Sequence, residues 1–384
     1  MASPEAKARL QIDDLLSSAG WDIQDRVDFN RHAKLGVAVR EFLMNDNTEA
    51  DYLLFVDGKA IGVIEAKKPD LSLSGVENQS QGYACNLPEG VRVHQMPLPF
   101  IYESNGSEIY FRDCRDEICR SRRVFAFHKP ETLLQMVNQD YTLRNNLRKL
   151  PELEKEGLRD CQVEAIEGLE QSLMTGKNRS LIHMATGAGK TFTTCNFTYR
   201  LLKHAKAKRI LFLVDRNNLG DQTKKEYEQF KPKDENRPFT DIYIVQHLQH
   251  NKIDKDAKIV ITTIQRLYSM LRGEEDYDEA NEEVSAYEIG SLGRPKEIVY
   301  NPKLPIDFFD FIVVDECHRS IYGDWRQVLE YFDAFTIGLT ATPSRHTLGY
   351  FNKNIVSEYP YERSVQSLKL SCLILFGCAY SDIS

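Results

Sequence analysis

The sequence lacks the features of secreted and membrane-spanning proteins. Its first residues, MASPEAKARLQIDD, do not have the basic and then apolar pattern of a signal peptide. The most apolar stretch, residues 368–380, is too short and too interrupted by polar residues to cross a bilayer, which needs about 20 apolar residues. We therefore expect a cytoplasmic protein with no membrane partner, whose eight cysteines are reduced thiols.

The chain also lacks a positive charge balance and a cysteine-based metal motif. Its net charge of −8 argues against broad adhesion to nucleic acid but leaves room for a local basic groove. Cys114 and Cys119 have no second cysteine pair, so their spacing predicts ordinary thiols. Residues 273–289 hold eight carboxylates and no Lys or Arg, which predicts a solvated insertion loop.

The length and composition predict two folded domains. The chain has 384 residues, of which 42% are hydrophobic and 28% are charged, as in ordinary globular proteins. A charged stretch with one proline, residues 143–157, is typical of a linker. We expect a first domain at residues 1–145, a linker at 146–157, a second domain at 158–365 and a diverged or frameshifted tail at 366–384.

The most informative part of the first domain is a predicted β-hairpin. Two apolar, β-prone runs flank Asp57-Gly58, which is a strong hairpin signal. Side chains alternate along a strand, so Glu65 and Lys67 share one face of the second strand. The face on which Asp51 lies depends on the length of the turn.

A two-residue turn would put Asp51 on the face of Ile64. An odd-length loop, Asp57-Gly58-Lys59, would pair Val56 with Ala60 and therefore Asp51 with Glu65. We predict the odd-length loop.

Two facing carboxylates predict a cation between them, because they repel each other otherwise. Mg²⁺ takes oxygen ligands and keeps several waters, one of which can attack a phosphodiester. Lys67 would orient that water and offset the charge that builds on the phosphate. The alternative is a hairpin whose polar face is exposed to solvent and binds no metal.

The next segment favours the nuclease interpretation. A capping box at residues 74–77 predicts a helix on which Gln79 and Tyr83 share a face. Asp51, then Glu65-Ala66-Lys67, then Gln79 and Tyr83 resemble the PD-(D/E)xK nucleases that carry a trailing Gln-xxx-Tyr helix. Ala50 stands where the family name has proline. The resemblance implies that Asp51 and Glu65 bind metal. It also implies that the catalytic residues are Asp51, Glu65, Lys67, Gln79 and Tyr83.

Glu41 matches an auxiliary acidic position of the same nucleases. It lies in an amphipathic run, residues 37–43, and the alternative interpretation is a solvated charge on a helix.

The second domain contains a phosphate-binding loop in its expected context. A short apolar strand, residues 180–184, precedes the loop, and a helical run follows it. The loop reads Ala185-Thr186-Gly187-Ala188-Gly189-Lys190-Thr191. Its glycines let backbone N–H groups of residues 186–189 surround phosphates at a helix N-terminus. Lys190 would contact the β- and γ-phosphates of ATP, and Thr191 would hold Mg²⁺.

A second acidic motif follows a continuous apolar strand, residues 309–314. In Asp315-Glu316-Cys317-His318, Asp315 would meet the metal held by Thr191 and Glu316 would polarise the attacking water. Together with the phosphate loop, this box resembles superfamily 2 helicases and translocases.

Further motifs of that superfamily occur in the expected order. Gln162 lies in a segment that resembles the adenine-reading motif. Residues 213–216 with Gln222, and residues 262–265, resemble segments that hold the DNA backbone, and residues 340–343 resemble the motif that links ATP hydrolysis to DNA movement. For each motif taken singly, the alternative interpretation is that its polar residues only form ordinary loops and helix caps.

The whole arrangement, over residues 25–365, resembles the restriction subunit of type I restriction-modification enzymes. The resemblance implies an α/β protein, with a PD-(D/E)xK nuclease fold followed by one RecA-like P-loop lobe built on a parallel sheet. It also implies ATP-dependent translocation and Mg²⁺-dependent cleavage of double-stranded DNA. The implied partners are duplex DNA and the methyltransferase and specificity subunits of a type I complex.

One departure from the family concerns the second motor lobe. Only 41 residues (384 − 343) follow Pro343, whereas a RecA-like lobe needs about 150. Our hypothesis is a truncated or frameshifted product that binds ATP weakly, and the alternative is a genuine but diverged C-terminal strand. The functional alternative is a nonenzymatic remnant that binds nucleotide and DNA.

Overall fold

The computed structural model describes residues 4–68, 82–277, 282, 298–319, 321 and 325–363, with side chains from residue 7 onward. The chain divides into two compact units. Unit 1 comprises Met1–Asn145, Ile298–Phe308 and Glu330–Asp333. Unit 2 comprises Asn146–Glu297, Phe309–Leu329 and Ala334–Ser384. Two short segments from late in the sequence therefore fold with unit 1.

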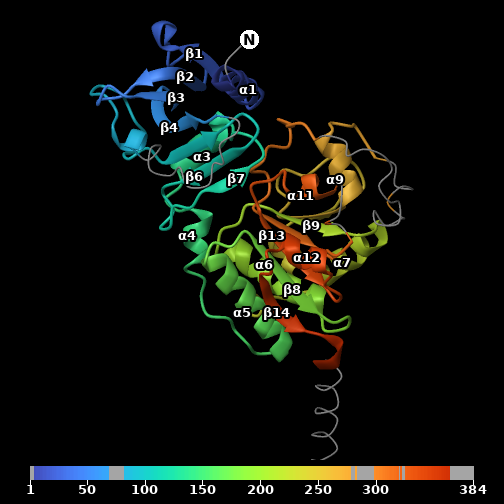
Figure 1. Cartoon of the computed structure of the whole chain (residues 1–384). Helices are drawn as coiled ribbons and strands as arrows, with labels where there is room; N and C mark the ends of the chain where they lie inside the picture. Colours follow the sequence, from blue (N-terminus) through green and yellow to red (C-terminus); the bar gives the residue numbers. More distant parts are fainter. Residues whose placement is uncertain are drawn as a thin grey trace, which may run out of the picture. The chain divides into compact units, whose positions relative to one another are not determined.

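Unit 1 is built on a mixed sheet, in which the described residues form seven strands in the order β1-β2-β3-β4-β5-β6-β7 (Figure 1). The pairs β1–β2 and β4–β5 are parallel, and the other neighbours are antiparallel. The strands are β1 Asp22–Asp25, β2 Gly36–Leu43, β3 Glu49–Val56, β4 Lys59–Ala66, β5 Phe100–Ser104, β6 Ile109–Asp113 and β7 Arg122–Val124. Among the helices of unit 1 are α1 Pro4–Ser18 and α3 Pro130–Val137, with a 3-10 turn at Arg26–Asp28, and α4 Leu143–Leu147 crosses the boundary between the two units.

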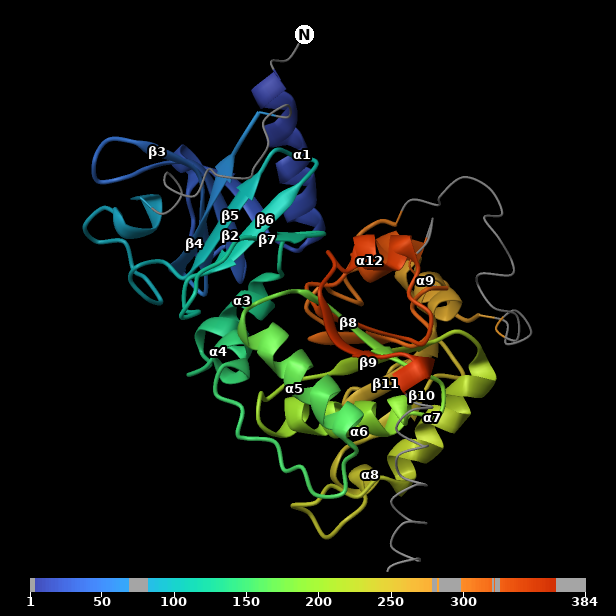
Figure 2. The ribbon, with the colours of Figure 1, turned by 60° about the horizontal axis from the view of Figure 1, so that its bottom comes forward.

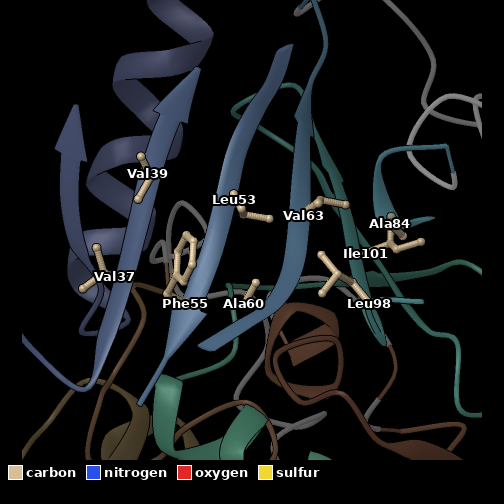
Figure 3. Close-up of a cluster of buried hydrophobic side chains, with 9 residues drawn as sticks. All are labelled: Val37, Val39, Leu53, Phe55, Ala60, Val63, Ala84, Leu98 and Ile101. Atoms are coloured by element: carbon tan, nitrogen blue, oxygen red, sulfur yellow. The ribbon is translucent and has the colours of Figure 1, made fainter. Parts of the chain in front are cut away.

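The core of unit 1 follows the alternation of side chains along these strands. Figure 3 shows the apolar cluster on one face, formed by Val37, Val39, Leu53, Phe55, Ala60, Val63, Ala84, Leu98 and Ile101. Tyr52 points to the opposite face, where its hydroxyl donates to Asp13 of α1 at 2.8 Å. Ile12 and Leu16, four residues apart on α1, are fully buried. Helix α1 therefore covers the face opposite the cluster.

The predicted hairpin exists, but its predicted loop is wrong. Val56 pairs with Lys59, so the turn has two residues, Asp57 and Gly58. Both have positive φ, 50° and 70°, which matches the turn that best fits the strand twist. An Asp-Gly pair adopts these angles at little cost.

A β-bulge then restores the register that the odd-length loop was meant to produce. Phe55 pairs with Ala60 but Leu54 pairs with Gly62, so Ile61 is the extra residue of β4. Beyond the bulge Tyr52 pairs with Ile64. Continuing this register by one residue sets Asp51 across from Glu65.

Unit 2 is an α/β fold on a fully parallel sheet. In the part of the chain that is described, its strands run in the order β10-β11-β9-β12-β13-β8-β14. The strands are β8 Arg179–Met184, β9 Ile210–Val214, β10 Val245–His247, β11 Ile259–Thr263, β12 Phe311–Val314, β13 Phe335–Thr340 and β14 Ile355–Tyr359. The helices are α5 Asp160–Met174, α6 Lys190–Lys203, α7 Asn217–Gln229, α8 Phe239–Ile242, α9 Ile264–Leu271, α11 Trp325–Leu329 and α12 Arg345–Tyr350. Figure 2 shows α5 and α6 on one side of this sheet and α9 on the other.

The predicted α/β class is confirmed, and several local predictions need correction. Helix α4 occupies part of the stretch predicted to be a linker. In the acidic segment predicted to be a solvated loop, Glu282 is only 1% exposed and pairs with buried Arg266 at 2.6 Å. The predicted tail, residues 366–384, and the capping box at 74–77 lie outside the described residues. Among the residues described, none of the helices is both long and apolar enough to traverse a bilayer.

Candidate functional site

Four carboxylates occupy one level of the unit 1 sheet, on the neighbouring strands β2, β3, β4 and β5. They are Glu41, Asp51, Glu65 and Glu103. The residues beside them, Arg40, Tyr52, Ile64 and Tyr102, are ladder partners from strand to strand. We call these four carboxylates the acidic row.

The sheet brings together the three central residues of the predicted nuclease site. The Lys67 ammonium lies 2.9 Å from Glu65 Oε1. Asp51 Oδ2 accepts the Ala66 backbone N–H at 2.8 Å, which fixes this carboxylate beside the end of β4. Burial raises the pKa of Glu65; the Lys67 ion pair opposes the rise, and the charges of Asp51 and Glu103 add to it. Repulsion from Asp51 agrees with the close approach that the register predicts.

These residues fit a divalent cation. Glu65 is 7% exposed, and its Oε2 atom is buried without a hydrogen-bond partner. A buried carboxylate oxygen without a partner is costly unless a cation satisfies it. No cluster of three or more His, Cys, Asp or Glu side chains gathers as metal ligands among the described residues. Mg²⁺ does not need one, because it is bound through one or two carboxylates and keeps its waters.

The predicted Gln-xxx-Tyr helix is only partly described. Tyr83 packs, partly buried, against the apolar cluster of unit 1. Burial raises the pKa of its hydroxyl, and the charges of Glu65 and Asp51 raise it further, so this side chain lies near the acidic row. Gln79 lies outside the described residues.

Glu41 is placed on a strand, which corrects the helical interpretation of its surroundings. It lies in β2 with a φ of 49°, a conformation that a residue with a side chain seldom adopts. Its carboxylate is half exposed and pairs with Arg9 of α1 at 2.5 Å. Arg9 also pairs with Asp51 at 2.8 Å.

Sequence reasoning missed two cations of the acidic row, Arg9 and Arg112. Arg9 is 32 residues from Glu41 and 42 from Asp51. Arg112 pairs with Glu103 at 2.7 Å with both side chains buried. No local spacing marks such pairs, because the strand order alone brings them together.

In unit 2 the predicted phosphate loop joins β8 to α6. Gly187 and Gly189 have φ values of 80° and 90°, which glycine adopts without strain. A Cβ atom at Gly189 would approach Gln162 Nε2 to 2.5 Å, so a side chain there would also be crowded. Lys190 and Thr191 follow in the first turn of α6.

The acidic box faces this loop. Lys190 Nζ lies 2.7 Å from Glu316 Oε1, although the two residues are 126 positions apart. Glu316 has a φ of 43°, a strained angle of the kind found at functional sites. Burial and the charge of Glu316 raise the pKa of Asp315 to about 6 against the opposing charge of Lys190. Parallel strands end at the same edge of a sheet, so β8 and β12 deliver both motifs there.

Gln162 holds the phosphate loop to α5. Its Oε1 accepts the backbone N–H of Arg159 at 3.0 Å, and its Nε2 donates to the Ala188 carbonyl at 3.4 Å. Its side chain is 3% exposed. The adenine-reading role predicted for it stays a prediction.

The other predicted motifs take part in hydrogen bonds within unit 2. His318 Nδ1 lies 3.0 Å from Thr340 Oγ1, which connects the acidic box to the motif after β13. Arg319 donates to Asp215 at 2.9 Å. Thr263 is buried and caps α9 by accepting the backbone N–H of Arg266, the cap chemistry that the sequence left as an alternative to DNA binding.

Comparison with known families gives two matches, one in each half of the chain. Residues 30–137 match the second domain of the type I restriction enzyme EcoKI endonuclease subunit. Residues 155–345 match the family described as type III restriction enzyme, res subunit.

Curated relatives are similar along most of this chain. The EcoKI endonuclease subunit of Escherichia coli K12 is 28% identical over 94% of this chain and 34% of its own length. The EcoAI endonuclease subunit of Escherichia coli is 31% identical over 85% of this chain and 37% of its own. A type I endonuclease subunit of Staphylococcus aureus strain COL is 27% identical over 76% of this chain and 30% of its own length. The chain spans about a third of the length of these relatives, and over most of its own length it is like a type I restriction enzyme endonuclease subunit.

Proposed function

We propose that this chain carries the DNA-cutting site and the first ATP-binding lobe of a type I restriction endonuclease. The proposed reaction is metal-dependent hydrolysis of phosphodiester bonds in double-stranded DNA at the acidic row of unit 1. Unit 2 would bind ATP and Mg²⁺ and contribute to translocation along the DNA. The proposal places the protein in the cytoplasm, with methyltransferase and specificity subunits as partners.

One observation carries the nuclease part of the proposal. Asp51, Glu65 and Lys67 meet at the end of two strands, and Glu65 Oε2 is buried without a partner. Asp51 and Glu65 would hold the ion, and bound Mg²⁺ supplies Lewis acidity. Lys67 would orient the attacking water and offset the charge on the phosphate. Tyr83, beside these charges, and Gln79 would position the DNA strand.

The nucleotide part rests on the approach of Lys190 to Glu316. The backbone N–H groups of residues 186–189 would surround the phosphates of ATP, and Lys190 would exchange Glu316 for the β- and γ-phosphates. Thr191 and Asp315 would hold Mg²⁺. Glu316, once released by Lys190, would orient the attacking water.

A plasmid-nicking assay with Mg²⁺ tests the proposed cleavage. We expect the wild-type chain to convert supercoiled DNA to the open circle, and Lys67→Ala to lower the rate at least 100-fold, because general acid–base and charge stabilisation are both lost. Lys59→Ala is the matched control, since Lys59 lies in the same strand and is exposed at the turn. Equal nicking by wild type and Lys67→Ala, or undiminished nicking in EDTA, would refute the proposal.

A further inference from the structure

We propose that Arg9 fills a second cation position in the acidic row, so that this site takes a single divalent ion between Asp51 and Glu65. This inference rests on the proposed nuclease function and deepens it. Arg9 is then a positioning residue that sets the metal stoichiometry.

The geometry of Arg9 is that of a bridge between two carboxylates. Its Nη1 lies 2.5 Å from Glu41 Oε1, and its Nη2 lies 2.8 Å from Asp51 Oδ1. Arginine presents several N–H groups in a rigid plane and stays protonated, so one guanidinium can hold two acids in fixed positions. An ion shared by Glu41 and Asp51 would have to occupy this place.

The two carboxylate oxygens of Asp51 have different partners, and Arg9 binds one of them. Oδ1 faces the guanidinium, whereas Oδ2 accepts the N–H of Ala66, the residue after Glu65. Asp51 is thereby held with Oδ2 toward β4, the strand that carries the buried and unpartnered Oε2 of Glu65. The arrangement leaves the Asp51–Glu65 side of the row for a metal and closes the Asp51–Glu41 side.

The charges of the row agree with one added ion. In the described part of the chain, its ion pairs set the three cations Arg9, Lys67 and Arg112 against four carboxylates. One net negative charge remains, and with the unpartnered Glu65 Oε2 it favours one added cation. Removing Arg9 makes this net charge −2 and leaves the position between Glu41 and Asp51 without a cation.

The strain at Glu41 is a second sign that the bridge is specific. A φ of 49° in the middle of a strand costs about 1 kcal/mol or more and persists only where other contacts impose it. Among the described residues, the ion-pair partner of Glu41 is Arg9. Arg9 is 42% exposed, so a metal ion in solution can reach the position when the guanidinium is removed.

Counting bound Mn²⁺ tests the inference directly. The full chain without nucleotide is titrated with Mn²⁺, and the free ion is measured by electron paramagnetic resonance. Asp51→Asn gives the ions bound elsewhere, which are subtracted. We expect one ion per chain at the acidic row in wild type and two in Arg9→Gln. Arg26→Gln is the matched control, because Arg26 pairs with Glu49 of β3 at 3.7 Å on the surface, and it should keep one ion.

The outcomes separate this inference from the proposed function. If wild type and Asp51→Asn bind the same number of ions, the metal site itself is refuted. If Asp51→Asn removes one ion but Arg9→Gln still binds one, only the role of Arg9 is overturned, and Arg9 merely ties α1 to the sheet. Should Arg9→Gln fail to fold, Arg9→Met replaces it: methionine keeps an unbranched apolar stem but brings no cation, so a second Mn²⁺ is expected, and a single one overturns the inference.

Discussion

Asp315 and Glu65 show how burial makes the charge of a single carboxylate costly. Each lies at the end of a strand, has a pKa raised first by burial, and has a neighbouring acid that raises the pKa further. A lysine opposes the rise in both cases, Lys67 for Glu65 and Lys190 for Asp315. Both carboxylates therefore carry a charge that the folded protein alone does not stabilise, and a bound cation would relieve this cost.

Replacing Asp315 should stabilise the protein at neutral pH. The pKa of Asp315 is about 6 in the folded state and about 3.9 in the unfolded state. Protonation of Asp315 therefore favours the folded state; this contribution to the free energy of unfolding is complete below about pH 3.9 and is lost as the pH rises through about 6. We expect Asp315→Asn to raise the free energy of unfolding at pH 7.5 by about 1–3 kcal/mol and to give a smaller gain at pH 5. Urea unfolding of both proteins without Mg²⁺ measures the difference.

The control for this prediction has the opposite sign. Asp215 is 3% exposed and pairs with Arg319, so Asp215→Asn should lower the stability at pH 7.5. A gain of equal size in both variants would show that the effect is not specific to the unpaired burial of Asp315.

At the scale of elements, the sequence predicted one hairpin and the phosphate loop but not the local irregularities. The hairpin and the phosphate loop follow from periodicity and glycine placement, which are local. The bulge at Ile61 is set by contacts between strands, so no local pattern marks it. Residues 37–43, around Glu41, are compatible with a helix when the sequence is taken alone. They form a strand because they pair with β3. Arg9 and Arg112 reach the acidic row through tertiary structure alone.

The close contact of β4 with β5 gives a test at this scale. A Cβ atom at Gly62 would lie 2.5 Å from the backbone oxygen of Phe100, and a backbone cannot move aside as a side chain can. We expect Gly62→Ala to lower the free energy of unfolding by about 1–3 kcal/mol. Because Gly62 adjoins the bulge that aligns Asp51 with Glu65, Mn²⁺ binding should weaken as well. Chemical denaturation and the Mn²⁺ titration measure the two effects.

Gly82→Ala is the matched control for Gly62→Ala. A Cβ atom at Gly82 meets nothing within 4 Å and the residue is helical, so alanine should be neutral or slightly stabilising there. Equal destabilisation by the two substitutions would contradict the steric argument.

At the scale of the whole molecule, unit 1 is assembled from distant parts of the sequence. Arg122 pairs with Asp333 through two bonds of 2.7 and 2.8 Å, and His128 Nε2 lies 3.3 Å from the same carboxylate. Thr132 donates to Asp307 at 3.1 Å. Burial raises the pKa of Asp333, but the charge of Arg122 and the bonds from His128 and Arg122 outweigh it and hold the pKa well below its usual value. Asp333 therefore stabilises unit 1 above about pH 3.9, and this contribution is lost as the pH falls below that value.

A fragment that ends at residue 145 should consequently be less stable than unit 1 within the full chain. The fragment keeps Arg122, an 11% exposed side chain, but loses its carboxylate partner. Breaking a buried pair from one side costs about 3–5 kcal/mol. We expect Asp333→Asn in the full chain to reproduce most of this loss, whereas Arg123→Ala, which breaks the exposed Arg123–Glu108 pair, should cost under about 1 kcal/mol. Fluorescence of Trp21, which lies in unit 1, follows the transition in every variant once Trp325 is replaced by Phe. A fragment as stable as the full chain would show that Glu330–Asp333 contributes nothing, but the paired burial of Arg122 and Asp333 predicts that unit 1 loses stability without chain from beyond the phosphate loop.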